Sequence, residues 1–211
     1  MNKKFVLIFP NLMNQHLIKD VGMIPYLLYK NYNFNSEIWS VKSKKLTYLN
    51  DEVKGLKVKN HNISNFFLIS YLYLLFKLFL DRRKINYLMI FHLNFISLSL
   101  SLIYKFFNHK GKIYIKADYD KNKIISNRLK IYRKIIFYLI FYLSHTISFE
   151  DKNVYNFFAK KFSLFKGKFL YLNNGIIFNS YIGHKKNKTM LTTARIGVNE
   201  KGIDILLKVL E

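Results

Sequence analysis

The stretch Thr189-Met-Leu-Thr-Thr-Ala-Arg195-Ile-Gly197-Val-Asn-Glu-Lys201-Gly202 precedes an apolar-periodic run at residues 203–210. This pattern predicts a short buried strand over residues 190–194, a polar loop, and a helix that begins near Lys201. An anion beside a helix N-terminus meets free backbone N–H groups and the positive end of the helix dipole. Because Arg195 and Lys201 bracket the loop, we expect them to bind a diphosphate rather than a lone carboxylate. The alternative is a solvated pair of side chains on the surface.

The composition is strongly basic and half hydrophobic. Among 211 residues, 35 are Lys or Arg, 12 are Asp or Glu, and 51% are hydrophobic, so the formal net charge is +23. A chain of this size can hold one full domain and the beginning of another. Phosphorylated substrates, anionic lipid and nucleic acid are the partners that such a charge favours. The lysines are spread along the chain rather than grouped, which argues against nucleic acid. Codon usage in an AT-rich genome would also explain part of the charge.

Several classes of protein are disfavoured by what the sequence lacks. It contains no cysteine, which excludes a disulfide framework and a Cys metal site. No G-x-G-x-x-G follows the first expected strand, which argues against a nicotinamide or flavin enzyme. The apolar segment at residues 5–10 is too short for the core of a signal peptide, so we expect a cytoplasmic protein.

Short apolar runs alternate with helix-periodic segments. Lys4-Phe-Val-Leu-Ile-Phe-Pro10 is a continuous apolar run that ends in a proline, as in a buried parallel strand. Further strands are expected over residues 37–41, 55–59, 87–92, 112–116, 145–148 and 168–172, and helices over residues 22–29, 66–80, 95–107, 126–144 and 151–162. We expect Pro25 in the first turn of its helix and Ser64 as the N-cap of the next. The alternation predicts an α/β fold with a Rossmann-like parallel sheet flanked by helices.

The end of the sequence resembles the start of the donor-binding domain in retaining GT-B glycosyltransferases of the group-1 (family-four) type. The matching residues are Arg195, Lys201, Gly202, Asp204, Leu206 and Leu207, whereas Ala194 replaces a usual glycine. Asn174-Gly175 is similar to the interdomain turn of that family. The sequence departs from the family in two further respects: no glycine precedes Gly22 in the first loop, and the paired-glutamate motif of the donor domain is absent.

The resemblance implies that residues 1–175 form the N-terminal acceptor-side domain of a GT-B fold. Residues 176–211 would form the hinge and the first strand–helix unit of a truncated donor-binding domain. The implied activity is transfer of a sugar, with retention, from a nucleotide-sugar donor to a glycan or lipid-linked acceptor in bacterial surface polysaccharide biosynthesis. The nucleotide sugar is then a co-substrate, Arg195 and Lys201 bind its diphosphate, and no cofactor or metal is needed. No catalytic base can be named, and such a fragment is expected to be inactive alone.

Three other residues are candidates for the acceptor site or the cleft. His92 ends one expected strand, Asp118 follows another, and His16 lies in the first loop. Ligands of open α/β sheets gather at the carboxyl edge, where such residues meet. The alternative for each is a purely structural role. Asp118 and Asp120 also match the D-x-D pattern that holds a divalent metal in GT-A transferases, which leaves a metal-dependent GT-A enzyme as an alternative.

Two segments, at residues 66–84 and 128–143, combine apolar runs with basic flanks. Each apolar run falls short of the roughly 20 residues that a spanning helix needs. They are therefore expected as core helices or as helices that lie on an anionic membrane surface, which would make the protein peripheral on the inner face of the plasma membrane. A basic membrane-surface or nucleic-acid-binding protein without enzymatic activity is the remaining alternative.

Overall fold

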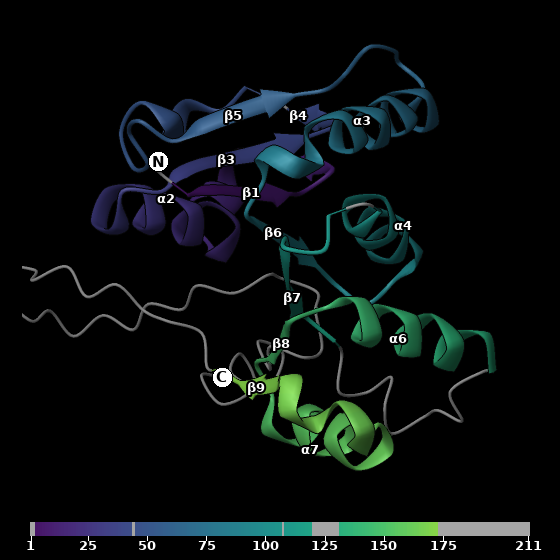
Figure 1. Cartoon of the computed structure of the whole chain (residues 1–211). Helices are drawn as coiled ribbons and strands as arrows, with labels where there is room; N and C mark the ends of the chain where they lie inside the picture. The colour runs from purple at the N-terminus through teal and green to yellow at the C-terminus, as the bar shows by residue number, and fades with distance from the viewer. Residues whose placement is uncertain (1–2, 44, 107, 120–130, 173–211) are drawn as a thin grey trace, which may run out of the picture. The chain divides into compact units, whose positions relative to one another are not determined.

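The protein contains a parallel sheet of seven strands in the order β5-β3-β1-β6-β7-β8-β9 (Figure 1). The computed structural model describes residues 3–43, 45–106, 108–119 and 131–172. The strands of this sheet are β1 Lys4–Ile8, β3 Asn35–Ser40, β5 Lys57–Asn60, β6 Tyr87–Phe91, β7 Lys112–Ala117, β8 Thr146–Phe149 and β9 Phe169–Tyr171. All neighbouring strands run parallel. The predicted α/β class with a Rossmann-like parallel sheet is confirmed.

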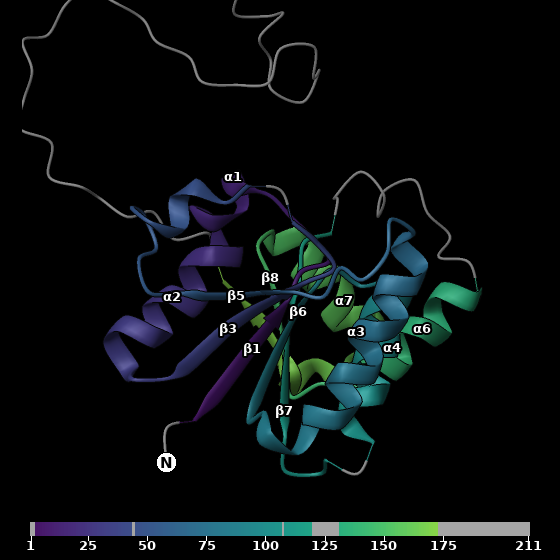
Figure 2. The same ribbon diagram turned by 90° about the horizontal axis from the view of Figure 1, so that it is seen from above.

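Helices cover both faces of the sheet. The α-helices are α1 Asn14–Leu17, α2 Asp20–Tyr32, α3 Phe67–Asp81, α4 Phe95–Lys105, α6 Ile131–Leu143 and α7 Lys152–Lys161, with short 3-10 turns η1 Thr47–Leu49, η2 Arg82–Lys84 and η3 Ser163–Lys168. A pair of two-residue strands, β2 Asn11–Leu12 and β4 Lys42–Ser43, lies next to the end of β1. Figure 2 shows α1 and α2 on one side of the sheet and α3, α4 and α6 on the other.

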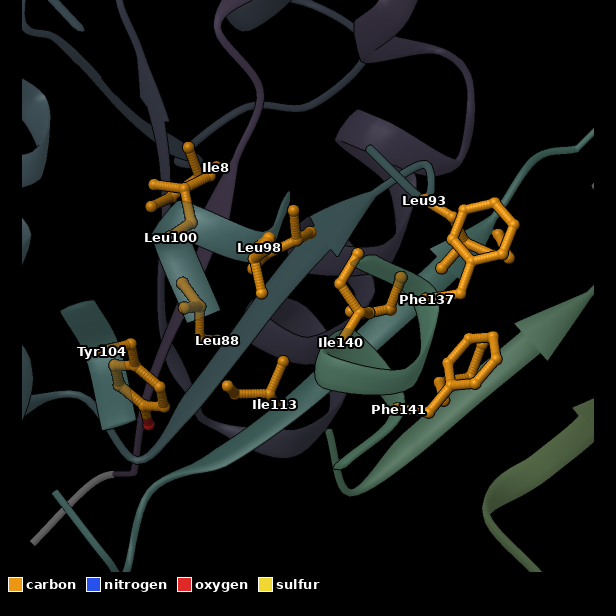
Figure 3. Packing of buried hydrophobic residues seen from close by; sticks show 14 of the residues in the cluster. Ile8, Leu88, Leu93, Leu98, Leu100, Tyr104, Ile113, Phe137, Ile140 and Phe141 are labelled. Atoms are coloured by element: carbon orange, nitrogen blue, oxygen red, sulfur yellow. The ribbon is translucent and has the colours of Figure 1, made fainter. Parts of the chain in front are cut away.

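The strands are apolar on both faces because both faces are covered. In β1, Val6 and Ile8 pack in the core beneath α3, α4, α6 and α7, whereas Phe5 and Leu7 pack in the core beneath α1 and α2. Figure 3 shows the first of these cores, where side chains of α4 and α6 meet those of β6 and β7. This two-sided burial explains why the strands appear in the sequence as continuous apolar runs.

Several expected boundaries are wrong, and side-chain contacts explain the shifts. Helix α2 begins at Asp20, so Pro25 lies in its second turn rather than its first. Ser64 is not the N-cap of α3: its hydroxyl accepts a hydrogen bond from the amide of Phe66, and the helix starts at Phe67. The hydroxyl of Ser70 fixes this start because it accepts from the amides of residues 63 and 64. The strand expected over residues 55–59 begins later because Gly55 has a φ of 91° and forms a turn.

The order of the strands creates a switch point between β1 and β6. The chain passes from β1 to β3 and β5 on one side, then returns to β6 on the other side of β1. Connections that leave two adjacent strands in opposite directions open a crevice at their carboxyl ends, where open α/β sheets bind ligands. Within the described ranges, no helix has the length and apolar character needed to cross a bilayer.

Candidate functional site

A small cavity lies at the switch point, between the residues that follow β1 and those that follow β6. Its volume is about 180 Å³. The lining residues are Ile8, Phe9, Pro10, Asn11, Phe67, Ile90, Phe91, His92, Asn94, Ile96 and Leu100. Most of these side chains are apolar, and Asn11, His92 and Asn94 supply the polar groups. Because pockets for complete small ligands usually measure about 300–1,000 Å³, this cavity can hold a single ring rather than a whole nucleotide sugar.

His92 has an unusual backbone conformation in this cavity. Its φ of 67° lies in the left-handed region, which is strained for a residue other than glycine. The backbone amide donates a 2.9 Å hydrogen bond to the carbonyl of Lys116 in β7. The ring nitrogen Nδ1 lies 3.4 Å from the carbonyl oxygen of Asp118. The backbone therefore turns sharply at the end of β6 and holds the imidazole at the carboxyl edge.

Asn94 links the cavity to the start of α4. It is the N-cap residue of this helix, and its side-chain oxygen accepts a 2.9 Å hydrogen bond from the amide of Ser97. The buried Ser97 hydroxyl donates to the carbonyl of His92 at 2.7 Å. This N-terminal cap fixes the loop after β6, so the polar groups of His92 and Asn94 are held in defined positions.

A charged cluster occupies the same edge on the α2 side of the sheet. The ammonium of Lys116 is paired with Asp20 at the start of α2 and with Glu150 after β8, at 2.6 Å from the latter. The side chain of Lys116 is 9% exposed. Burial lowers the pKa of Lys116, but the hydrogen bonds and charges of Asp20 and Glu150 outweigh burial and hold that pKa above its ordinary value. The cluster thus keeps a buried positive charge between two carboxylates.

A hydroxyl pair adjoins this cluster. The hydroxyl groups of Tyr114 and Ser148 lie 2.6 Å apart on neighbouring strands. Burial raises the pKa of Tyr114 above its ordinary value. Ser148 is 1% exposed, so the hydroxyl pair lies inside the protein and ties β7 to β8.

His16, one of the expected site residues, lies in α1 close to the cavity. Its ring packs edge-on against Phe9, with centroids 4.8 Å apart. Burial and then the charge of Lys19 lower the pKa of His16, so the imidazole is neutral at pH 7. Its Nδ1 accepts a 3.0 Å hydrogen bond from the amide of Met13. Phe9 lines the same cavity as His92, so the fold brings the two predicted histidines to one edge.

Of the other expected site residues, only Asp118 belongs to the described residues. Asp118 directly follows β7 and is exposed. Arg195, Lys201, Asp120 and the Asn174-Gly175 turn lie outside the described residues, so the diphosphate site and the domain division remain predictions. Among the described residues, no group of three or more His, Asp or Glu side chains is arranged to hold a metal ion.

Sequence reasoning missed the cluster formed by Lys116, Asp20 and Glu150. Lys116 interrupts an otherwise apolar strand core, and a charge at such a place must be paired. A charge within an apolar strand identifies Lys116 but not the residues that pair with it. Its partners follow from the sheet order, because Asp20 belongs to the helix after β1 and Glu150 to the end of β8.

No protein-family model and no curated protein matches the sequence. Solved structures do resemble the fold. UDP-GlcNAc 2-epimerase from Methanocaldococcus jannaschii aligns with a TM-score of 0.53 and 12% identity, over 82% of this chain and 46% of that chain. UDP-GlcNAc 2-epimerase from Neisseria meningitidis, in a structure bound to UDP-GlcNAc, aligns with a TM-score of 0.51 and 16% identity, over 80% of this chain and 46% of that chain.

UDP-N-acetylglucosamine 2-epimerase from Rickettsia bellii gives a TM-score of 0.51 at 11% identity, over 82% of this chain and 45% of that chain. The chain thus spans less than half the length of these structures. Similarity at such identities concerns the fold, which is the Rossmann-like half of a GT-B-type architecture.

Proposed function

We propose that this chain is the acceptor-side part of a GT-B glycosyltransferase that uses a nucleotide sugar. The observation that carries the proposal is the cavity at the switch point between β1 and β6, lined by Asn11, His92 and Asn94. Ligands of open α/β sheets bind at this position. A cavity with room for one ring, an apolar wall and a few polar groups suits a sugar of the acceptor or of the donor.

The diphosphate of the donor is assigned to Arg195 and Lys201, in line with the sequence pattern around them. Negative charge builds up on the leaving phosphate as the bond to the sugar breaks. Cations held there bind the transition state more strongly than the ground state and so accelerate transfer. The acceptor is then a glycan or a lipid-linked sugar, and no cofactor is required.

A second candidate function is epimerisation of a nucleotide sugar. It is favoured by the solved structures that resemble this fold, which are UDP-GlcNAc 2-epimerases. Both candidates require a bound nucleotide sugar, and they differ in the product: a transferase moves the sugar to an acceptor, whereas an epimerase returns a nucleotide sugar with one inverted carbon.

The test is calorimetric titration of the full chain with UDP-GlcNAc and UDP-glucose. We expect measurable binding, and about tenfold to 100-fold weaker binding for Arg195→Ala and for Lys201→Ala, because each removes a charge-assisted hydrogen bond of roughly 1.5–3 kcal/mol. Lys160→Ala, at an exposed position in α7, is the matched control and should leave affinity unchanged. Unchanged affinity in both site variants would refute the diphosphate assignment.

Products then separate the two functions. Incubation with UDP-GlcNAc and a lipid-linked acceptor should release UDP and extend the acceptor if the protein is a transferase. A change of configuration in the sugar, with the nucleotide sugar otherwise intact, would identify an epimerase. Because the chain spans less than half the length of the similar structures, binding is the primary readout and turnover the secondary one.

A further inference from the structure

The outer side of α3 carries an apolar stripe. Leu68, Leu72, Phe76 and Leu80 follow one another at intervals of four residues and are 66%, 56%, 56% and 51% exposed, respectively. Residues four apart share one face of a helix, so these side chains form a line along it. The opposite face holds Tyr71, Leu74 and Leu78, which are buried in the core. Helix α3 is therefore apolar along this outer side as well as on its buried side, whereas a helix of a globular surface normally has a polar outer face.

The neighbouring helices of the same layer also expose apolar side chains. Helix α4 lies between α3 and α6 (Figure 2). It exposes Leu102, while α6 exposes Ile135, Tyr138 and Tyr142. We call the exposed apolar residues of the three helices the outer apolar face; its members are Leu68, Leu72, Phe76, Leu80, Leu102, Ile131, Ile135, Tyr138, Leu139 and Tyr142. An exposed apolar surface of this extent indicates a binding partner.

The elements that carry this face are rich in positive charge. The basic residues of α3, η2, α4 and α6 are Lys77, Arg82, Arg83, Lys84, Lys105, Arg133 and Lys134, and the acid in these elements is Asp81, which is paired with Lys84. Basic flanks on an apolar face are complementary to the anionic headgroups and acyl chains of a bilayer. A second copy of the chain would instead place like charges opposite one another.

We propose that the outer apolar face of α3, α4 and α6 docks on a bilayer that contains anionic phospholipid. The helices lie in the plane of the interface with their apolar side chains among the acyl chains, and the basic residues contact the headgroups. This mode of binding agrees with the absence, within the described ranges, of a helix able to cross a bilayer.

Docking would place the candidate site at the membrane surface. Phe67, in the first turn of α3, is 40% exposed and also lines the cavity with His92. The cavity and the outer apolar face thus meet at the carboxyl edge of the sheet. A lipid-linked acceptor could enter from the bilayer at this edge; this consequence rests on the proposed function, whereas docking itself does not.

The test is cosedimentation of the full chain with vesicles. Vesicles of phosphatidylglycerol and phosphatidylcholine in equal amounts should bind the protein, and vesicles of phosphatidylcholine alone should bind it much more weakly. The double variant Leu72→Gln/Phe76→Gln should reduce partitioning about tenfold or more, because each side chain loses burial of apolar surface. The matched control is Leu27→Gln/Tyr32→Gln, which alters exposed apolar residues of α2 on the other side of the sheet.

Charge variants complete the test. Arg83→Gln and Lys134→Gln should each lower partitioning about fivefold at low salt, since a basic residue near an anionic surface contributes about 1 kcal/mol. Lys30→Gln on α2 should have no effect. Circular dichroism should show that the variants remain folded, since the replaced side chains are exposed.

Three results would overturn the proposal. Wild-type protein could fail to sediment with anionic vesicles. The Leu72→Gln/Phe76→Gln variant could bind as well as the wild type. Analytical ultracentrifugation could show a dimer that this double variant dissociates, in which case the face joins two copies of the chain. A separate titration of the wild-type protein tests the proposed function. If it shows no binding of UDP-GlcNAc or UDP-glucose, the proposed function is refuted and the docking result still stands.

Discussion

Lys116 and Glu150 form an ion pair of 2.6 Å at the carboxyl edge of the sheet, where β7 and β8 end side by side. Asp20, from the start of α2, approaches the same ammonium from another part of the chain. One buried lysine therefore joins the helix after β1 to the ends of two later strands. The pair lies at the same edge of the sheet as His92, whose backbone amide donates a hydrogen bond to the carbonyl of Lys116.

Replacement of Lys116 by Met should destabilise the protein. The change removes the cation and leaves Asp20 and Glu150 facing an apolar side chain. Loss of one partner of a fully buried pair costs about 3–5 kcal/mol, and because the two carboxylates here are 30% and 29% exposed, we expect about 2 kcal/mol. Urea denaturation measures the difference. Lys84→Met, which breaks an exposed pair with Asp81, should change stability by less than about 0.5 kcal/mol.

Glu37 should make stability depend on pH in the acid range. Burial by itself raises the pKa of Glu37, but hydrogen bonds from Trp39 and Lys59 and the charge of Lys4 hold that pKa below its ordinary value of 4.5. A depressed folded-state pKa stabilises the protein above the unfolded value, and this stability is lost as the pH falls through the folded value.

Glu37→Gln should therefore cost about 2 kcal/mol at pH 7, and the difference from the wild type should shrink below about pH 4.5. Urea midpoints measured at a series of pH values give this comparison. Glu52→Gln, at an exposed position in a turn, should follow the wild-type curve. A constant difference at every pH would mean that the carboxylate charge is not the source of the effect.

The left-handed backbone of His92 should make glycine more stable than alanine at this position. At φ 67° glycine is unstrained, whereas any residue with a side chain is strained. His92→Gly should thus be more stable than His92→Ala by about 1 kcal/mol. At Asn156, exposed within α7, the order should reverse, because Ala favours helix interiors over Gly by about 1 kcal/mol. Thermal unfolding of the four variants measures both differences, and equal stability of the two His92 variants would contradict the strained turn.

Gly22 should not tolerate alanine. It lies in α2, where Ala would normally add about 1 kcal/mol of stability. A Cβ at this position would overlap the backbone carbonyl of Leu17 at the end of α1, and backbone cannot move aside as a flexible side chain can. We expect Gly22→Ala to lose about 2–3 kcal/mol. Gly167→Ala, where no atom lies within 4 Å of the new Cβ, should change stability by less than about 0.5 kcal/mol. Chemical denaturation of both variants tests the contrast.

Local sequence patterns predicted the elements well and their ends less well. The apolar run that ends at Pro10 became β1, and the run before His92 became β6. The predicted start of α3 was wrong because the hydroxyl of Ser70, inside the helix, accepts hydrogen bonds from the backbone amides of residues 63 and 64. The usual N-cap pattern does not contain such a contact. Among the candidate site residues, His92 lines the cavity and His16 packs against Phe9, which lines it too, whereas the assignments to Arg195 and Lys201 stay predictions.

The sequence by itself determined the α/β class, because burial on both faces of a strand and on one face of a helix leaves a periodic pattern in neighbouring residues. Only the tertiary structure decided that β6 returns beside β1, which creates the cavity, and that Lys116 meets Asp20 and Glu150. It also decided which of the apolar side chains of α3 face outward. These features depend on residues distant in the chain, whose proximity is set by strand order rather than by any local pattern.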